Sequence, residues 1–321
     1  MSDLNEALRR AVAFLLAGQD ADGGWRDFNL YKGVATSWTT AYVAGALADA
    51  ADLDHRIPEA CAAAAWFLRR HREPGGGWAY NARCMADADT TALALIFLAR
   101  LIPAPSLKDV AVLASFQRAD GGFATYKHLP SSHPWAAAHA EVTATALRAL
   151  SLFLAADHGI LRTARAWLAG QADPDGGAYW WTTPDYLALE LARLGVASDN
   201  GPAEARADTC PFADALNLER SILLNAGRAV ISAAMEALVR RQSPDGSWPS
   251  EPILLVPGPT SRVGSLGARA GPANADQRRL FTTATVLAAL NAARRGSIAG
   301  NRTSGDTGAR PFAQASAPGV Q

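Results

Sequence analysis

The sequence has little cysteine, no surplus of either charge and no long uncharged apolar run. Its three cysteines, Cys61, Cys84 and Cys210, are scattered and odd in number, which argues against a disulfide framework and favours a reducing, cytoplasmic setting. Thirty basic residues balance thirty acidic ones, which argues against a general nucleic-acid binder. No uncharged apolar run reaches the roughly 18 residues that a membrane-spanning helix needs, so we expect no transmembrane segment.

Several enzyme motifs are missing too. There is no paired CxxC and no HExxH, so spacing predicts no metal site. The G-x-S-x-G nucleophile elbow and the phosphate-loop motif are also absent. The first residues, "MSDLNEALRRAVAFLLAGQD", carry charges early and lack a small-residue cleavage pattern, so we do not expect a signal peptide here.

A short pattern of glycines and an aromatic residue recurs along the chain. Its copies are "GQDADGGW", "HREPGGGW", "FQRADGGF", "GQADPDGGAY" and "RQSPDGSW", ending at Trp25, Trp78, Phe123, Tyr179 and Trp248. Each copy follows an Ala/Leu-rich stretch of helical period. Glycine accepts positive φ without a steric penalty, so Asp-Gly and Gly-Gly favour turns. The pattern predicts a helix that ends in a tight turn, with the aromatic ring packed back against the helix end.

A second pattern follows each turn and is typical of a helix start. Its copies are "SWTTAYVAGAL" (37–47), "DADTTALALIFL" (87–98), "HAEVTATALRAL" (139–150), "WWTTPDYLALEL" (180–191) and "LFTTATVLAAL" (280–290). Each has a hydroxyl or an acid at the cap, with Ala and Leu behind it. The helices before the turns are amphipathic, whereas those after them are apolar nearly all round. This contrast predicts outer helices that cover inner ones.

Outer and inner helices that alternate around a closed ring form an all-α barrel of the α/α type. We expect eleven helices in one domain, residues 1–295, with the stretch 196–211 in place of one outer helix. A Pro/Gly-rich insertion at 249–279 interrupts the last repeat, and loops of such length are usually functional or disordered. The tail, 296–321, has few large hydrophobic residues and is expected to be disordered.

The turns resemble the QW repeats of the squalene-hopene cyclase and protein prenyltransferase superfamily. "DADTTA" resembles the aspartate motif of class II terpene cyclases, in a DxDTT form. The resemblance covers residues 1–295 and implies an (α/α)6 barrel around an apolar cavity. It also implies the cyclisation of a linear polyprenyl substrate, started by protonation of an alkene or epoxide. Because the chain has room for one helical domain, it looks most like the single-domain cyclases that convert prenylated aromatic acids to meroterpenoids.

The segment "DADTTALAL" holds two acids where one would suffice for a helix cap. Protonating an alkene needs a carboxylic acid that is still protonated, and burial or a second carboxylate raises an aspartate pKa. The resemblance makes Asp89 the proton donor, with Asp87 holding a hydrogen-bond network or tuning the pKa. Thr90 stands where relatives have another aspartate, and its hydroxyl is a candidate partner for Asp89. The alternative is an ordinary helix start, whose cap is worth about 1 kcal/mol.

Alignment of the five helix starts on Thr-Thr-Ala puts one set of side chains at the barrel rim. The set is Trp38, Asp89, Glu141, Trp181 and Phe281. Aromatic faces stabilise a cation by about 0.5–2 kcal/mol each, so we expect these rings, with the adjacent Trp180, to line the cavity. One turn further along, Tyr42 is the main cavity candidate. Ordinary packing is the alternative for each ring. Because the Thr-Thr-Ala frame is shared, we also expect capping not to require the acids.

Four further residues are candidates on weaker grounds. Glu141 is a candidate for the base that removes the final proton, or for an ion-pair partner at a helix start. His139 aligns with Asp87 and either orients an acid or is structural. Arg262 and Arg269, in the insertion, either bind a carboxylate or diphosphate head group or are ordinary surface residues.

The favoured function is therefore a class II terpene cyclase that acts on a small polyprenyl substrate. We expect no required cofactor, and Mg²⁺ only if the substrate is a diphosphate. A lipophilic substrate leaves open a peripheral contact with a membrane. Two alternatives remain: a non-catalytic α/α toroid that binds a lipid or a protein partner, and a prenyltransferase-like subunit, which would need zinc although no Asp/Cys/His trio matches the spacing of that family.

Overall fold

The chain is mostly helical. The computed structural model describes residues 2–101, 106–171, 179–196, 210–258 and 272–303. In these residues it has eleven α-helices, a 3-10 turn at Pro134–Ala136 and two small antiparallel hairpins. The all-α expectation is confirmed, with two hairpins that the repeat pattern did not predict.

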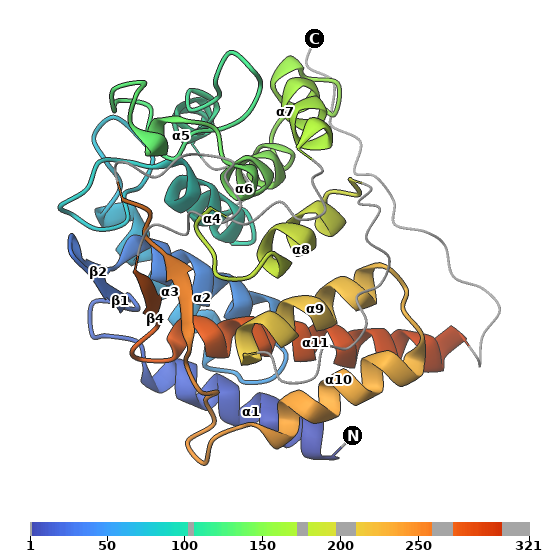
Figure 1. The fold of residues 1–321 in the computed structure, drawn as a ribbon. Helices are drawn as coiled ribbons and strands as arrows, with labels where there is room; N and C mark the ends of the chain where they lie inside the picture. Colours follow the sequence, from blue (N-terminus) through green and yellow to red (C-terminus); the bar gives the residue numbers. More distant parts are fainter. Residues whose placement is uncertain (1, 102–105, 172–178, 197–209, 259–271, 304–321) are drawn as a thin grey trace, which may run out of the picture.

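Six helices of the described chain lie side by side in a closed ring (Figure 1). They are α2 (Ser37–Asp49), α4 (Ala88–Leu98), α6 (Ala140–Leu150), α8 (Asp185–Arg193), α9 (Pro211–Leu223) and α11 (Leu280–Thr303). Each helix contacts the next, and α11 returns to α2. Since neighbours cover both sides of such a helix, its sequence must be apolar nearly all round. In α4 every residue except Asp89 is buried.

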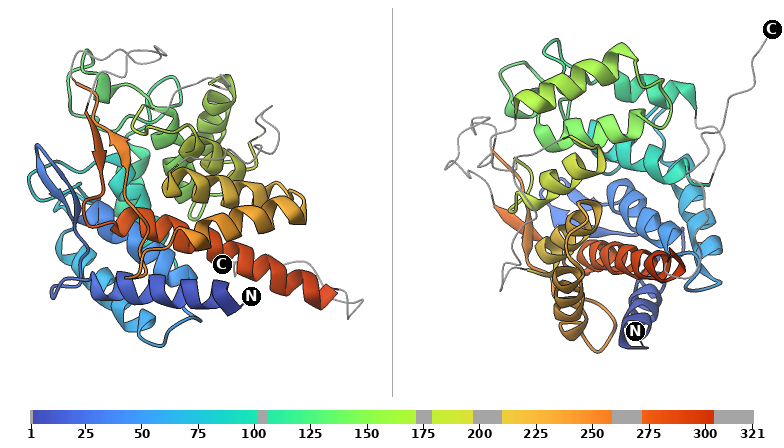
Figure 2. Two further views of the ribbon diagram at one scale, coloured as in Figure 1. Left: turned by 60° about the horizontal axis from the view of Figure 1, so that its bottom comes forward. Right: turned by 90° about the vertical axis from the view of Figure 1, so that its right-hand side faces the viewer.

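The remaining helices cover this ring from outside, as the right-hand view of Figure 2 shows for α7 at one side and α1 and α10 at the other. They are α1 (Ser2–Ala17), α3 (Ile57–Arg70), α5 (Leu107–Ala114), α7 (Gly159–Gly170) and α10 (Arg228–Arg240). Among described residues, α1 packs on α11, α3 on α2, α5 between α4 and α6, α7 on α6, and α10 mainly on α9. The expected replacement of an outer helix at 196–211 falls almost wholly outside the described residues.

At three of the glycine turns a tryptophan joins an outer helix to an inner one. At Trp78 the indole Nε1 donates to the carbonyl of Leu68, at the end of α3, across 2.7 Å. The backbone N–H of Trp78 donates to the hydroxyl of Thr91, in the first turn of α4, across 3.0 Å. Both bonds recur at two other turns, Trp25 with Leu15 and Thr40, and Trp248 with Leu238 and Thr283.

The glutamine before each of three turns joins successive outer helices. The side-chain amide of Gln117 donates to the carbonyl of Gly121 in its own turn and to the carbonyl of Ile160 in α7. The same pair of bonds recurs at Gln19, with Gly23 and Ala60, and at Gln242, with Gly246 and Ala7. These bonds satisfy buried carbonyl groups at places where two helices meet, so the glutamine and the aromatic residue together fix the turn.

Glycine is required in the turn itself. Gly121 has φ +99°, and a Cβ built on it would lie 2.7 Å from the carbonyl oxygen of Thr163 in α7. An L side chain would therefore meet both an unfavourable backbone conformation and a backbone atom that cannot move aside. The lack of a side chain at Gly121 therefore lets the turn pack directly against α7.

Both hairpins lie at one end of the ring, where β1 contacts β4 (Figures 1 and 2). The first pairs β1 (Asp27–Leu30) with β2 (Gly33–Ala35), and the second pairs β3 (Pro252–Leu255) with β4 (Ala273–Ala275). The second belongs to the expected insertion at 249–279, whose centre lies outside the described residues. The buried carboxylate of Asp27 ties this end to the last inner helix, because it accepts the backbone N–H groups of Arg278, at 2.9 Å, and Leu280, at 3.0 Å.

Residues 296–303, which were expected to begin a disordered tail, belong to the last helix. α11 continues to Thr303, so residues 296–303 are helical and the expectation of disorder was wrong for them. No proline interrupts this stretch, and Gly296 does not end the helix although glycine is common just past a helix end. Residues 304–321 lie outside the described part of the chain.

Candidate active site

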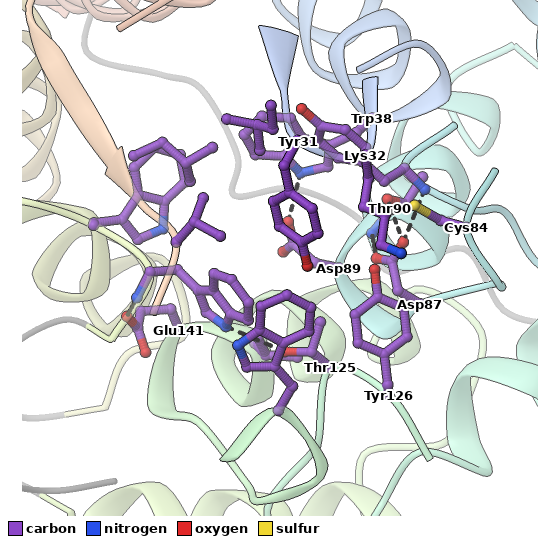
Figure 3. A pocket seen from close by; sticks show the side chains of 18 residues that line it. Tyr31, Lys32, Trp38, Cys84, Asp87, Asp89, Thr90, Thr125, Tyr126 and Glu141 are labelled. Carbon is purple, nitrogen blue, oxygen red and sulfur yellow. Dashed lines mark hydrogen bonds between the residues drawn. The ribbon is translucent and has the colours of Figure 1, made fainter. Parts of the chain in front are cut away.

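Two adjoining cavities open at the hairpin end of the ring. The inner cavity, of about 110 Å³, is enclosed by the β1–β2 hairpin, the first turns of α2, α4 and α6, and the loops before these helices (Figure 3). Its aromatic lining consists of Tyr31, Trp38, Tyr80, Tyr126, Trp135, Trp180 and Trp181. The outer cavity, of about 400 Å³, shares Leu30, Tyr31, Trp135 and Val256 with the inner one.

Asp89 lies in the first turn of α4 and faces the inner cavity (Figure 3). Its Oδ2 accepts the indole N–H of Trp38, from α2, across 2.6 Å. Burial raises the pKa of Asp89 to about 6, and the negative charges of Glu190 and Glu141 add to the rise, whereas the bond from Trp38 opposes it. A carboxyl with such a pKa is about one-tenth protonated at pH 7, far more than an aspartate of ordinary pKa.

Asp87 is the N-cap of α4. Its Oδ1 accepts the backbone N–H of Thr90 across 2.7 Å, and its Oδ2 accepts the hydroxyl of Thr90 at 2.9 Å and the backbone N–H of Tyr80 at 3.0 Å. Burial, with the charge of Asp89, raises the pKa of Asp87 to about 7. Two expectations were wrong: the hydroxyl of Thr90 pairs with Asp87 and not with Asp89, and the helix start does use an acid as its cap.

The hydrogen bonds distinguish the two acids. Both oxygens of Asp87 are taken up by donors of its own helix turn and the preceding loop. The Oδ1 of Asp89, in contrast, receives no hydrogen bond from the residues that the structure describes, and its carboxyl borders the cavity. Both acids line the cavity and the pKa of Asp87 is raised further, but Asp89 alone of the two has an oxygen that receives no hydrogen bond from the described residues, so its carboxyl is the less constrained one for proton transfer.

The aromatic rim residues divide into two groups. Trp38, Trp180 and Trp181 line the inner cavity as expected. Phe281 is fully buried behind them and stacks on Trp38, with ring centroids 4.7 Å apart. Tyr42 stacks on Phe281 from the far side, at 3.6 Å. Neither Phe281 nor Tyr42 lines the inner cavity, so their expected cavity roles were wrong: the wider indole rings of the rim cover the deeper residues.

Glu141, in the first turn of α6, also lines the inner cavity. Its Oε1 accepts the backbone N–H groups of Tyr179 and of Trp180, the latter at 3.0 Å, and burial raises its pKa. Within the described residues it has no ion-pair partner, and both of its expected roles stay predictions.

His139 does not orient an acid. Its Nε2 lies 3.0 Å from the carbonyl oxygen of Pro134, and its ring stacks on Tyr179 with centroids 3.9 Å apart. Burial lowers its pKa to about 4, so the ring is neutral at pH 7. His139 is the N-cap residue of α6, as Asp87 is of α4, but unlike Asp87 it does not line the inner cavity.

Solved structures with the same architecture include terpene cyclases. The type II terpene cyclase MstE from Scytonema aligns with a TM-score of 0.77 and 29% sequence identity, over 92% of this chain and 99% of that one. The chain is a structural relative of the type II terpene cyclases. Variants of the Scytonema enzyme have been solved with geranylgeranyl dihydroxybenzoate, the substrate, and with merosterolic acid A, the product.

Two further solved structures share the fold. A protein from Actinoplanes aligns with a TM-score of 0.75 and 29% identity, over 91% of this chain and 99% of that one. An ent-copalyl diphosphate synthase from Streptomyces platensis aligns with a TM-score of 0.58 and 19% identity, over 80% of this chain and 50% of that one; this likeness is one of fold alone. No protein-family model matches the sequence, and no curated protein matches it.

The alignment of the repeats missed much of the lining of the inner cavity. Seven of the residues not foreseen are Tyr31, Lys32, Tyr80, Cys84, Thr125, Tyr126 and Trp135. They come from the loops between each glycine turn and the next inner helix, which the alignment left out. The aromatic residues clustered in these loops were the available signal.

Three other expectations concern metals, membranes and head groups. The described residues contain no group of three or more His, Cys, Asp or Glu that could hold a metal ion. None of the helices in that part of the chain is long and apolar enough to cross a membrane. Arg262 and Arg269, the candidate head-group residues, lie outside the described residues.

Proposed function

We propose that this chain is a class II terpene cyclase in which Asp89 protonates the end of a linear polyprenyl substrate. The single observation that carries the proposal is a protonatable carboxyl that faces an aromatic cavity and has one oxygen without a hydrogen bond from any described residue. On this proposal the ring is a single (α/α)6 barrel domain that spans residues 1–295. The glycine turns are then QW repeats, and "DADTT" is the aspartate motif of these cyclases. The scattered cysteines suit a cytoplasmic enzyme.

The reaction begins with proton transfer from Asp89 to the terminal double bond or epoxide of the prene. An alkene takes the proton on its CH carbon, which leaves a tertiary carbocation on the dimethyl-substituted carbon. An epoxide takes it on oxygen, and cleavage of the C–O bond leaves the same tertiary carbocation; in both cases Asp89 is left as a carboxylate. The indole N–H of Trp38 stabilises that carboxylate, because a hydrogen bond to an ionised oxygen is stronger than one to a neutral oxygen. The faces of Trp38 and Trp181 stabilise the migrating positive charge by about 0.5–2 kcal/mol each.

Cyclisation ends when a base removes a proton from the last cation. Glu141 is our candidate, because it borders the same cavity from α6 and its Oε1 is fixed by two backbone N–H groups. No metal ion takes part in these steps, and Mg²⁺ would be needed only for a diphosphate head group. We propose a prenylated aromatic acid as the substrate, by similarity to the Scytonema enzyme.

The test is incubation of the full chain with geranylgeranyl dihydroxybenzoate and with geranylgeranyl diphosphate, followed by liquid chromatography and mass spectrometry. A cyclase yields a product of unchanged mass and altered retention. We expect Asp89→Asn to lose about 10³-fold in rate, the scale of a lost general acid, with its helical circular dichroism intact. Asp185→Asn is the matched control, since Asp185 also opens an inner helix but does not line the inner cavity. An active Asp89→Asn variant would falsify the assignment.

A further inference from the structure

Phe28, in β1, has a backbone conformation that a phenylalanine rarely adopts. Its φ is +51°, in the left-handed region that a Cβ makes unfavourable. It is the bulged residue of the strand, because its neighbours Asp27 and Asn29 pair with successive residues of β2 and leave Phe28 without a partner there. Bulges and strained residues of this kind gather near functional sites, where they direct a side chain that a regular strand would place elsewhere.

Two side chains hold Phe28 in this conformation. The carboxylate of Asp27 accepts the backbone N–H of Phe28 across 2.9 Å, and the hydroxyl of Tyr80 donates to the carbonyl of Phe28 across 2.7 Å. Both polar backbone groups of the bulged residue are therefore satisfied. Successive side chains of a regular strand point to opposite faces, yet Asp27 and Phe28 are both buried. The bulge is thus what turns the ring of Phe28 into the protein.

The ring of Phe28 lies beside the stacked rings of Trp38 and Phe281. Its centroid is 5.4 Å from that of Trp38 and 5.5 Å from that of Phe281, and the stacked centroids are 4.7 Å apart. Nearly equal distances to both rings place Phe28 at the side of the stack, since a ring on top of it would be close to one member only. Stacked rings tolerate an offset, so stacking alone does not stop the indole of Trp38 from sliding. Phe28 blocks that movement on one side.

The position of the Trp38 indole decides whether its N–H reaches Asp89. The nitrogen lies 2.6 Å from Oδ2 of Asp89 (Figure 3). A slide of about 1 Å away from the carboxyl would take this distance past the usual range of an N–H donor. The bond between Trp38 and Asp89 therefore depends on what packs against the indole from behind the cavity.

We infer that Phe28 is a positioning residue of the proposed proton donor: the bulge of β1 holds its ring against the side of the Trp38 indole, so that the indole N–H stays on Asp89. Phe28 does not line the inner cavity, so it acts through Trp38 and does not touch the substrate. The kinetic consequence rests on the proposed cyclase function, whereas the contact between Trp38 and Asp89 can be measured without any substrate.

The charged groups that act on Asp89 come from other elements than β1. They are Asp87 at the start of α4, Glu141 and Arg148 on α6, and Glu190 on α8. A change of Phe28 leaves these four groups in place. Its effect on Asp89 should therefore pass through the hydrogen bond of Trp38, which α2 contributes.

The direct test is nuclear magnetic resonance of the full chain labelled with ¹⁵N at tryptophan. The indole N–H signal of Trp38 is identified as the one that Trp38→Phe lacks. In the wild type it should shift with pH around the pKa of Asp89, about 6, because the N–H faces the ionising carboxyl. In Phe28→Leu the signal should lose most of this pH-dependent shift, since the indole is free to move away.

Phe212→Leu is the matched control for the loss of a buried ring. Phe212 is as fully buried as Phe28, but it stacks on Trp181, with centroids 5.2 Å apart, and not on Trp38. The Trp38 signal should keep its full shift with pH in this variant. A loss of the shift in both variants would mean that any gap in the aromatic cluster disturbs Asp89, which overturns a specific role for Phe28.

The kinetic test uses the pH dependence of kcat/KM with geranylgeranyl dihydroxybenzoate. The bond of Trp38 stabilises ionised Asp89, so its loss in Phe28→Leu should move the alkaline limb up by about 1 pH unit. The same substitution should move the limb no further in a Trp38→Phe background, because the bond is already absent there. Phe212→Leu should leave the limb in place.

Tyr80→Phe is the second variant and decides the test if Phe28→Leu loses its helical circular dichroism. It keeps every ring and removes only the hydroxyl that holds the carbonyl of Phe28, so both measurements should change in the same direction by a smaller amount. An unchanged Trp38 signal in the folded variant, or limb shifts of Phe28→Leu and Trp38→Phe that simply add, would overturn the positioning role. Absence of turnover by the wild type removes the cyclase instead and leaves the resonance result standing.

Discussion

The bond between Trp38 and Asp89 controls how easily the proposed proton donor ionises. Trp38→Phe keeps an aromatic ring but removes the N–H that donates to Asp89 across 2.6 Å. A hydrogen bond to a charged group is worth about 1.5–3 kcal/mol, and one pKa unit corresponds to about 1.36 kcal/mol. Because the bond stabilises the ionised form, the pKa of Asp89, now about 6, should rise by about 1 to 2 units in the variant.

The predicted consequence is a shift of the alkaline limb of the pH–rate profile. Only protonated Asp89 can start the reaction, so kcat/KM should be flat below its pKa and fall about tenfold per pH unit above it. We expect the fall to begin near the pKa of about 6 in the wild type and about 1 to 2 pH units higher in Trp38→Phe. The plateau should be lower in the variant, because the carboxyl is no longer oriented. Initial rates with geranylgeranyl dihydroxybenzoate across this pH range measure both effects.

Trp180→Phe provides the matched control. Trp180 lines the same cavity, but its indole donates to Thr125 and not to Asp89, so the alkaline limb should keep its wild-type position. The reasoning is refuted if the limb of Trp38→Phe stays in place or moves to lower pH. It is also refuted if both tryptophan variants shift the limb equally, since the cause would then be a general change in cavity polarity.

Three further predictions concern stability, measured as the free energy of unfolding in urea. Asp87→Ala leaves the buried cap donors of α4 without an acceptor and should cost about 2–4 kcal/mol. Arg148→Met removes a 2.7 Å ion pair from Glu190, whose side chain is 1% exposed; because Glu190 keeps its pair with Arg193, the cost should be about 1–3 kcal/mol. Gly121→Ala should cost more than about 1 kcal/mol, whereas Gly296→Ala, in open space on α11, should stabilise by about 0.5–1 kcal/mol. Unchanged midpoints for the first two, or a stabilised Gly121→Ala, would contradict the contacts described.

The sequence determined those features that depend on neighbours along the chain. Helix period, cap residues and glycine turns act within a few residues, so the order of outer and inner helices was predictable from the repeats. The resemblance of "DADTT" to a known motif also singled out Asp89 before its surroundings were known. The pairing of Thr90 with Asp87, three residues apart, was local as well, and could have been predicted as an ordinary cap.

Only the tertiary structure decided which side chains surround Asp89. Trp38 is 51 residues away in sequence, and ring closure alone brings it to the carboxyl that it bonds. The same closure covers Phe281 and Tyr42 with wider indole rings, and brings Tyr31 and Trp135 from separate loops to the cavity mouth. A repeat fixes where a residue lies on its own helix, but cavity lining depends on what the neighbouring helices and loops leave uncovered, which no single repeat encodes.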